Sequence, residues 1–139
     1  MPLEITPQVI LFLAGLAGAL IAIGFVLARP QARANAHLAA ALSAGFAAFT
    51  AVVLASEGVL PVWENHTANL WGVQVWWDLL IAVTIALVLI APRARAAGMN
   101  LPLWGLFVVA TASIGLLALC ARLFWLEARG APEAASPSA

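Results

Sequence analysis

Four apolar stretches, each long enough to span a bilayer as a helix, dominate this sequence. They cover residues 7–28, 36–56, 70–91 and 102–126. A helix needs about 20 mostly apolar residues to cross the hydrocarbon core of a membrane. The sequence therefore predicts an all-α membrane protein with four antiparallel transmembrane helices.

The composition agrees with a membrane location. Hydrophobic residues make up 65% of the 139 residues and charged residues only 9%, whereas a soluble domain has roughly 25% charged residues. The chain has no lysine and no net charge, so it lacks the basic surface that binds nucleic acid. Its one cysteine, Cys120, excludes an internal disulfide and a cysteine zinc site, and we expect it to pack between helices.

The third stretch carries a carboxylate inside its length. The uncharged segment between Asp78 and Arg93 is too short to cross a core of ~30 Å at 1.5 Å per residue. The helix must therefore begin near Asn69 or Trp71, which places Asp78 about two turns from its start. The preceding segment, residues 57–69, is expected to lie along the membrane interface.

The two ends of the chain differ in character. The first residues contain an acid and no positive charge before the apolar stretch, which is the reverse of a secretory signal, so the first helix is expected to remain as a span. The last residues, 130–139, are small, polar and proline-containing, and predict a flexible tail. Residues 1–129 are expected to form a single four-helix bundle.

The distribution of arginine predicts an orientation. Two turns on one side of the predicted bundle hold Arg29, Arg33, Arg93 and Arg95. The other side is expected to hold Arg122, Arg129 and all six acids: Glu4, Glu57, Glu64, Asp78, Glu127 and Glu133. Because cytoplasmic loops are enriched in Lys and Arg, both termini are predicted to lie outside. The Ala- and Arg-rich composition favours a bacterial inner membrane, so outside means the periplasm.

This arrangement suggests a partner for the buried acid. Asp78 in the third predicted helix and Arg122 in the fourth would lie at similar depth on consecutive antiparallel helices. A lone charge inside a membrane helix costs about 2.5–3.5 kcal/mol, and pairing lowers that cost. We therefore predict an ion pair between Asp78 and Arg122. The alternative is that both side chains extend separately to the membrane surface.

Most of the tryptophans are predicted on the outer side of the bundle. They are Trp63, Trp71, Trp76, Trp77 and Trp125. Tryptophan commonly forms a belt at membrane interfaces, but a belt normally occupies both interfaces. The alternative is an outer pocket for a lipid, quinone, carotenoid or partner helix.

The two histidines, His37 and His66, are predicted on opposite faces of the membrane, so they cannot share a metal ion. A hydrated interfacial histidine is the default for each, and the alternative is a single axial ligand to a tetrapyrrole. No metal site is predicted. Small residues also recur at four-residue spacing, as in Ala40-Ala44-Ala48 and Thr111-Gly115, which favours close helix packing.

Several short motifs in the second half recur together in one family. They are Asp78-Leu79-Leu80, the turn from Arg93 to Gly98, Leu103-Trp104, Ala110-Thr111 followed by Gly115, and the exit from Trp125 to Arg129. With this pattern the segment from Gly72 to Arg129 resembles a family of short bacterial polytopic membrane proteins, known only as a domain of unknown function. The chain departs from the family at Ala121, where the family has proline. The resemblance implies a polytopic membrane protein and no particular activity.

The functional expectation is mainly negative. The sequence has no Ser/His/Asp grouping, no phosphate-binding glycine loop and no pair of membrane carboxylates, which argues against most enzymes without excluding one. The leading hypothesis is a non-catalytic accessory or assembly subunit of an energy-converting or pigment-containing membrane complex. The alternative is a protein or enzyme that binds an isoprenoid or carotenoid lipid at the Trp-rich face. A small transporter comes third, since few polar groups are available for a transport path.

Overall fold

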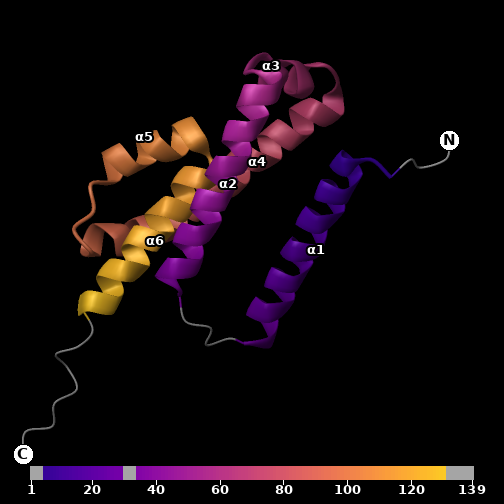
Figure 1. The fold of residues 1–139 in the computed structure, drawn as a ribbon. Helices are drawn as coiled ribbons and strands as arrows, with labels where there is room; N and C mark the ends of the chain where they lie inside the picture. The colour runs from indigo at the N-terminus through magenta and orange to yellow at the C-terminus, as the bar shows by residue number, and fades with distance from the viewer. Residues whose placement is uncertain (1–4, 30–33, 131–139) are drawn as a thin grey trace, which may run out of the picture. The chain divides into compact units, whose positions relative to one another are not determined.

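The computed structural model describes residues 5–29 and 34–130, and the elements within those ranges are helices (Figure 1). In chain order they are α1 (Pro7–Ala28), α2 (Ala36–Glu57), α3 (Leu60–Thr67), α4 (Leu70–Ala96), α5 (Leu101–Thr111) and α6 (Ser113–Gly130). The predicted all-α class is confirmed. Three helices, α1, α2 and α4, are long and apolar enough to cross a membrane. Glu4, Arg33, Glu133 and the predicted tail beyond Gly130 lie outside the described residues.

The chain divides into two units, Met1–Ala34 and Asn35–Ala139. The first unit contains α1 alone. The Thr6 side chain caps this helix by accepting a hydrogen bond of 3.4 Å from the Val9 N–H, and Pro7 occupies the first turn, where its missing N–H costs nothing. The ends of α1 match the predicted stretch.

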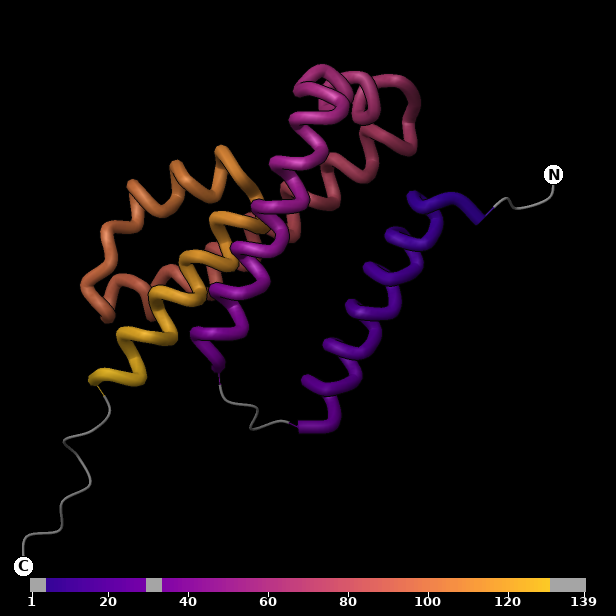
Figure 2. Tube along the Cα trace, viewed as in Figure 1, coloured from indigo at the N-terminus to yellow at the C-terminus, as the bar shows by residue number. Residues whose placement is uncertain are grey.

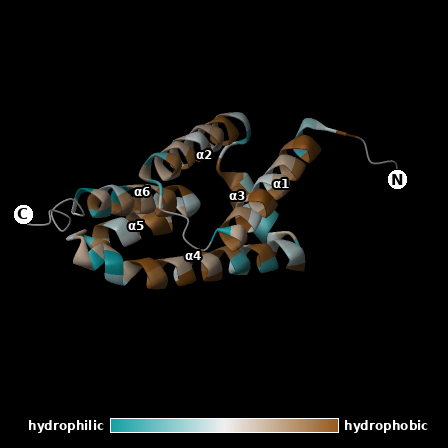
Figure 3. Cartoon of the chain, turned by 90° about the horizontal axis from the view of Figure 1, so that it is seen from below, coloured by the Kyte–Doolittle hydropathy of each residue, from teal (hydrophilic) through white to brown (hydrophobic). Residues whose placement is uncertain are grey.

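Asparagine begins three of the helices in the second unit. Asn35, Asn69 and Asn100 each accept a hydrogen bond from the backbone N–H three residues later, at the starts of α2, α4 and α5. Such caps satisfy N–H groups that a helix start leaves without a partner. Hydrophobic residues fill the middle of α4, and hydrophilic residues lie toward its ends (Figure 3).

The end of α4 is a glycine-dependent turn. Gly98 has φ +73°, and the Met99 N–H donates to the Ala94 carbonyl at 2.9 Å, the pattern of a Schellman cap. Met99 is thereby folded back into the core beside Ala94. The turn directs α5 back along α4.

The core of the second unit lies between α4, α5 and α6. Val108, Leu119 and Leu123 are its largest fully buried side chains. Around them pack Val83, Leu87, Ile90, Ala97, Leu101, Trp104, Leu116, Phe124 and Leu126. Figure 2 shows the chain reversing between α5 and α6, so that these two helices run side by side in opposite directions.

The second helix packs on α6 through small residues. Ala39 and Ser43 are buried on this face of α2, and the Ser43 hydroxyl donates to the Ile114 carbonyl at 2.9 Å. Small side chains let two helix backbones approach closely. The predicted series Ala40-Ala44-Ala48 lies one position away and is exposed, so the packing face differs from the one that the sequence pattern suggested.

The prediction of one continuous helix over residues 102–126 is wrong. The helix is broken at Ala112, which has φ +48° and ψ −116°, a conformation close to the first central position of a type II′ turn. Local sequence favours a helix here, since neither Gly nor Pro lies at the break. Tertiary packing decides instead, because the reversal buries Leu119 and Leu123.

Because of this break, the C-terminal end of α6 lies at the opposite end of the bundle from the one predicted. The Arg93 Nε and Nη2 donate to Glu127 Oε1 and Oε2 at 2.9 and 2.7 Å. This bidentate ion pair joins the C-terminal ends of α4 and α6. The four-helix prediction had placed Arg93 and Glu127 on opposite sides of the membrane. In the structure they lie side by side, because α6 returns toward the end at which α5 began.

Replacing Ala112 with glycine should raise the stability of the protein. A non-glycine residue in such a conformation costs on the order of 1–3 kcal/mol, and glycine relieves that strain. The control is Ala110→Gly within α5, which should lower stability by about 0.5–1 kcal/mol. Thermal unfolding in mild detergent would compare the two variants. If both substitutions lowered the midpoint by similar amounts, the segment would be a continuous helix.

Candidate lipophilic site

Two adjoining cavities lie in the second unit at the end opposite to the Arg93–Glu127 pair. The first, which we call the α3 pocket, has a volume of about 360 Å³. The second, the hairpin-tip pocket, has a volume of about 460 Å³ and lies at the α5–α6 break. Val62 and Trp76 line both. The two cavities therefore adjoin through these shared side chains.

The α3 pocket depends on a close approach of two helix backbones. A Cβ atom built on Gly72 would overlap the Asn65 carbonyl oxygen and lie 3.1 Å from the His66 Cα. Only glycine lets the first turn of α4 pass this close to α3. The approach sets the aromatic residues of α3 beside those of α4.

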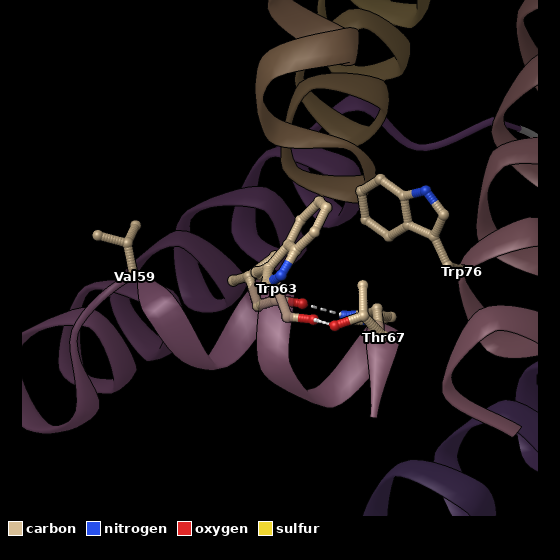
Figure 4. A pocket seen from close by; sticks show the side chains of 6 residues that line it. Val59, Trp63, Thr67 and Trp76 are labelled. Atoms are coloured by element: carbon tan, nitrogen blue, oxygen red, sulfur yellow. Dashed lines mark hydrogen bonds between the residues drawn. The ribbon is translucent and has the colours of Figure 1, made fainter. Parts of the chain in front are cut away.

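Aromatic side chains form the walls of the α3 pocket. Trp63 from α3 and Trp76 from α4 lie on opposite sides of it (Figure 4). The His66 ring meets Trp76 edge-on, with ring centroids 5.1 Å apart and planes at 63°. Val59 and Val62 complete an apolar lining. Such walls suit a flat or elongated apolar molecule.

The polar atoms of the α3 pocket have defined roles. His66 Nδ1 lies 2.6 Å from the Val62 carbonyl oxygen, which can only accept, so the proton of a neutral His66 is on Nδ1. Its Nε2 is then an acceptor. The Thr67 hydroxyl donates to the Trp63 carbonyl at 2.8 Å, which leaves its oxygen to accept as well. The pocket therefore offers side-chain acceptors to a ligand hydroxyl.

The hairpin-tip pocket is lined mainly by apolar side chains, together with three threonines. Its walls come from α2, α3, α4 and the broken segment, and are formed by Phe46, Thr50, Leu54, Val62, Trp76, Leu79, Leu80, Val83, Thr84, Leu87, Val108, Val109, Ala110, Thr111, Ala112 and Ile114. The hydroxyls of Thr84 and Thr111 each donate at 2.7 Å to a carbonyl of their own helix. These protons are therefore not available to a ligand, and the pocket suits a hydrocarbon chain.

The structure divides the five predicted tryptophans among different places. Trp63 and Trp76 line the α3 pocket. Trp77 lines a different groove along α4, which shares Leu80 and Thr84 with the hairpin-tip pocket. Trp71 is 78% exposed. Trp125 lies on α6 with arginine side chains over its ring. Sequence position on one predicted side was therefore not enough to place all five in one site.

The predicted pair of Asp78 and Arg122 is not formed in the structure. Measured from the level of the Arg93–Glu127 pair, Asp78 lies about 22 Å back along α4, and Arg122 about 7 Å back along α6, at 1.5 Å per residue. The two side chains are thus at different heights. The Arg122 guanidinium lies instead 4.5 Å from the centroid of the Trp125 ring.

The two histidines also have different surroundings. His66 contributes to the α3 pocket, whereas His37 is exposed in the first turn of α2. Among the described residues no three His, Cys, Asp or Glu side chains gather closely enough to hold a metal ion. The role of His66 as a tetrapyrrole ligand stays a prediction.

Apart from Trp76, the residues of the hairpin-tip pocket were not identified as site residues from the sequence. Thr50, Thr84 and Thr111 each occur singly within apolar stretches, and Ala112 looks like an ordinary helical residue. The one sequence signal for this pocket was the spacing of Thr111 and Gly115. In the structure a Cβ on Gly115 would lie 2.7 Å from Thr111 Oγ1 and 2.8 Å from Val108 Cα, so the close packing of α5 and α6 requires glycine there. The four-residue spacing was visible, but not the reversal that it serves.

Comparison with known proteins gives no match to a family model, to a curated protein or to a solved structure. The resemblance of residues 72–129 to a family of unknown function accordingly stays a prediction.

Proposed function

We propose that this protein is an integral membrane protein that binds a long apolar lipid of the isoprenoid type. The observation that supports it is the pair of adjoining cavities that share Val62 and Trp76. Their volumes of about 360 and 460 Å³ fall within the range of roughly 300–1,000 Å³ that is usual for ligand sites. The apolar chain would occupy the hairpin-tip pocket.

The head of the ligand would occupy the α3 pocket. His66 Nε2 and the Thr67 oxygen are acceptors there, for the reasons given above. A ligand with a hydroxyl group, such as a quinol or a prenol, would donate to them. The faces of Trp63 and Trp76 would pack against a ring or a conjugated chain.

We place the protein in the cytoplasmic membrane of a bacterium, with α1, α2 and α4 as the spans. A helix of 11 residues such as α5 is about 16 Å long, roughly half of the hydrocarbon core. The pair α5–α6 would thus enter from one side, reverse at Ala112 and leave by the same side. Backbone that is not helical is tolerated at membrane depth where its polar groups are satisfied within the protein. At the break the Ala112 N–H donates to the Val108 carbonyl, and the Ala112 carbonyl accepts from the Leu116 N–H.

Trp76 provides the test of ligand binding, because it lines both cavities. The protein would be purified from membranes in mild detergent, and its bound quinones, carotenoids and prenols would be extracted and quantified by mass spectrometry. Trp76→Ala should retain about tenfold less ligand than the wild type. Trp71→Ala, on the same helix but outside both cavities, should retain the wild-type amount. Equal retention by both variants would contradict the proposal.

The same purification also tests the second candidate function, that of a non-catalytic accessory subunit of a larger membrane complex. Asp78 favours that candidate, because within the described residues it forms no ion pair and lies outside the lipophilic site. A carboxylate at this depth calls for a polar partner, which a neighbouring protein would supply. A preparation that contained a stoichiometric second protein and no apolar ligand would support the subunit role instead.

A further inference from the structure

We propose that the C-terminal end of α6 binds the phosphate headgroup of an anionic membrane phospholipid through Arg122 and Arg129. This site is separate from the lipophilic cavities and does not depend on what they bind. It lies at the end of the second unit where α4 and α6 finish, marked by the Arg93–Glu127 pair. It does depend on the placement of that end at a membrane surface.

The two arginines share one tryptophan. The guanidinium carbon of Arg122 lies 4.5 Å from the centroid of the Trp125 ring, and that of Arg129 lies 3.7 Å from it. Arg122 is three residues before Trp125 and Arg129 four residues after it, so all three lie on one face of α6. Both arginine side chains are exposed on that face.

Contact with the ring orients these guanidinium groups without using their hydrogen-bond donors. A cation over a ring is held by the π face, and the N–H groups remain at the edge of the guanidinium plane. Among the described residues, neither arginine forms an ion pair. Arg93 differs, because its Nε and Nη2 already donate to Glu127. Arg122 and Arg129 therefore present the planar arrangement of donors that binds phosphate oxygens.

The surroundings favour a phospholipid as the source of that phosphate. Phe124 and Leu126 flank Trp125 and pack against the apolar core, so the arginines lie at the edge of the packed apolar part of α6. Arg95, at the end of α4, adds a further positive charge at this end. Basic residues at a cytoplasmic membrane surface attract anionic lipids, and tryptophan prefers the same interfacial depth.

Binding can be measured by native mass spectrometry of the full chain, released from nanodiscs that contain phosphatidylglycerol and phosphatidylcholine. Arg122→Gln and Arg129→Gln should each reduce the amount of retained phosphatidylglycerol about fivefold. Arg93→Gln is the matched control, because it removes one positive charge at the same end from a side chain whose donors are occupied. It should leave retention within twofold of the wild type.

Two outcomes would overturn the proposal. Equal losses in all three variants would mean that the lipid responds only to total charge, and unchanged retention in Arg122→Gln and Arg129→Gln would mean that these residues bind no headgroup. Trp125→Leu keeps both charges and removes the ring, and should lower retention two- to threefold, which a purely electrostatic attraction would not. Free inorganic phosphate added in excess should not displace the lipid if the headgroup and its chains bind together.

Discussion

Gly115→Ala should destabilise the protein by about 1–3 kcal/mol, the usual cost of forcing extra atoms into a packed interior. The added Cβ would lie 2.8 Å from the Val108 Cα and 2.9 Å from the Phe107 carbonyl oxygen. These are backbone atoms of α5, which cannot move aside as a flexible side chain would. The helices α5 and α6 would have to separate, and the burial of Leu119 and Leu123 would be reduced.

Gly105→Ala is the matched control for this prediction. Gly105 lies within α5, and a Cβ there would meet no atom within 4 Å. Alanine should therefore stabilise the helix by roughly 0.5–1 kcal/mol, through the lower conformational entropy of the unfolded chain. Thermal unfolding of both variants in one detergent would measure the difference. A rise in stability for Gly115→Ala would contradict the hairpin, because alanine in a continuous and uncrowded helix is favourable.

The positions of the long helices could be predicted from the sequence because their causes are local. The apolar stretches reach the length of a span, and Thr6, Asn35 and Asn100 cap the helices that begin there. The start of α4 at Leu70 was fixed by the need for enough residues before Arg93. Each of these features depends on residues of the helix itself or of its cap, and not on contacts with another helix.

The reversal at Ala112 could not be predicted, because its cause is not local. The segment around it contains good helix-forming and β-branched residues but no glycine or proline at the turn. What favours the turn is burial of Leu119 and Leu123 against Val108 and Ala94, between residues far apart in sequence. The same non-local packing selected Ala39 and Ser43, rather than the neighbouring alanine series, as the face of α2.

The candidate lipophilic site could be predicted only in part, because its pockets also depend on packing between residues that are distant in sequence. Trp63, His66 and Trp76 were each singled out, but of the segment that carries Trp63 and His66 only a position along the interface was expected. In the structure it forms α3, held against α4 by the close approach at Gly72. The hairpin-tip pocket follows from the break at Ala112, and could not be inferred before the break was known.

We expect the tail after α6 to be cytoplasmic. Cysteines introduced on the two sides of the membrane should then differ completely in their labelling in intact cells. In a Cys120→Ala background, Ala68→Cys between α3 and α4 should react with a membrane-impermeant maleimide. Ser136→Cys in the tail should react only after the membrane is permeabilised, as should the control Ala97→Cys at the end of α4. The reason is the positive-inside preference: a hairpin that returns at Ala112 puts the ends of α4 and α6, with Arg93, Arg95, Arg122 and Arg129, on one side. A fourth span would instead put Arg122 and Arg129 on the opposite side of the membrane from Arg93 and Arg95. Labelling of Ser136→Cys in intact cells would therefore support the four-span arrangement and exclude the hairpin.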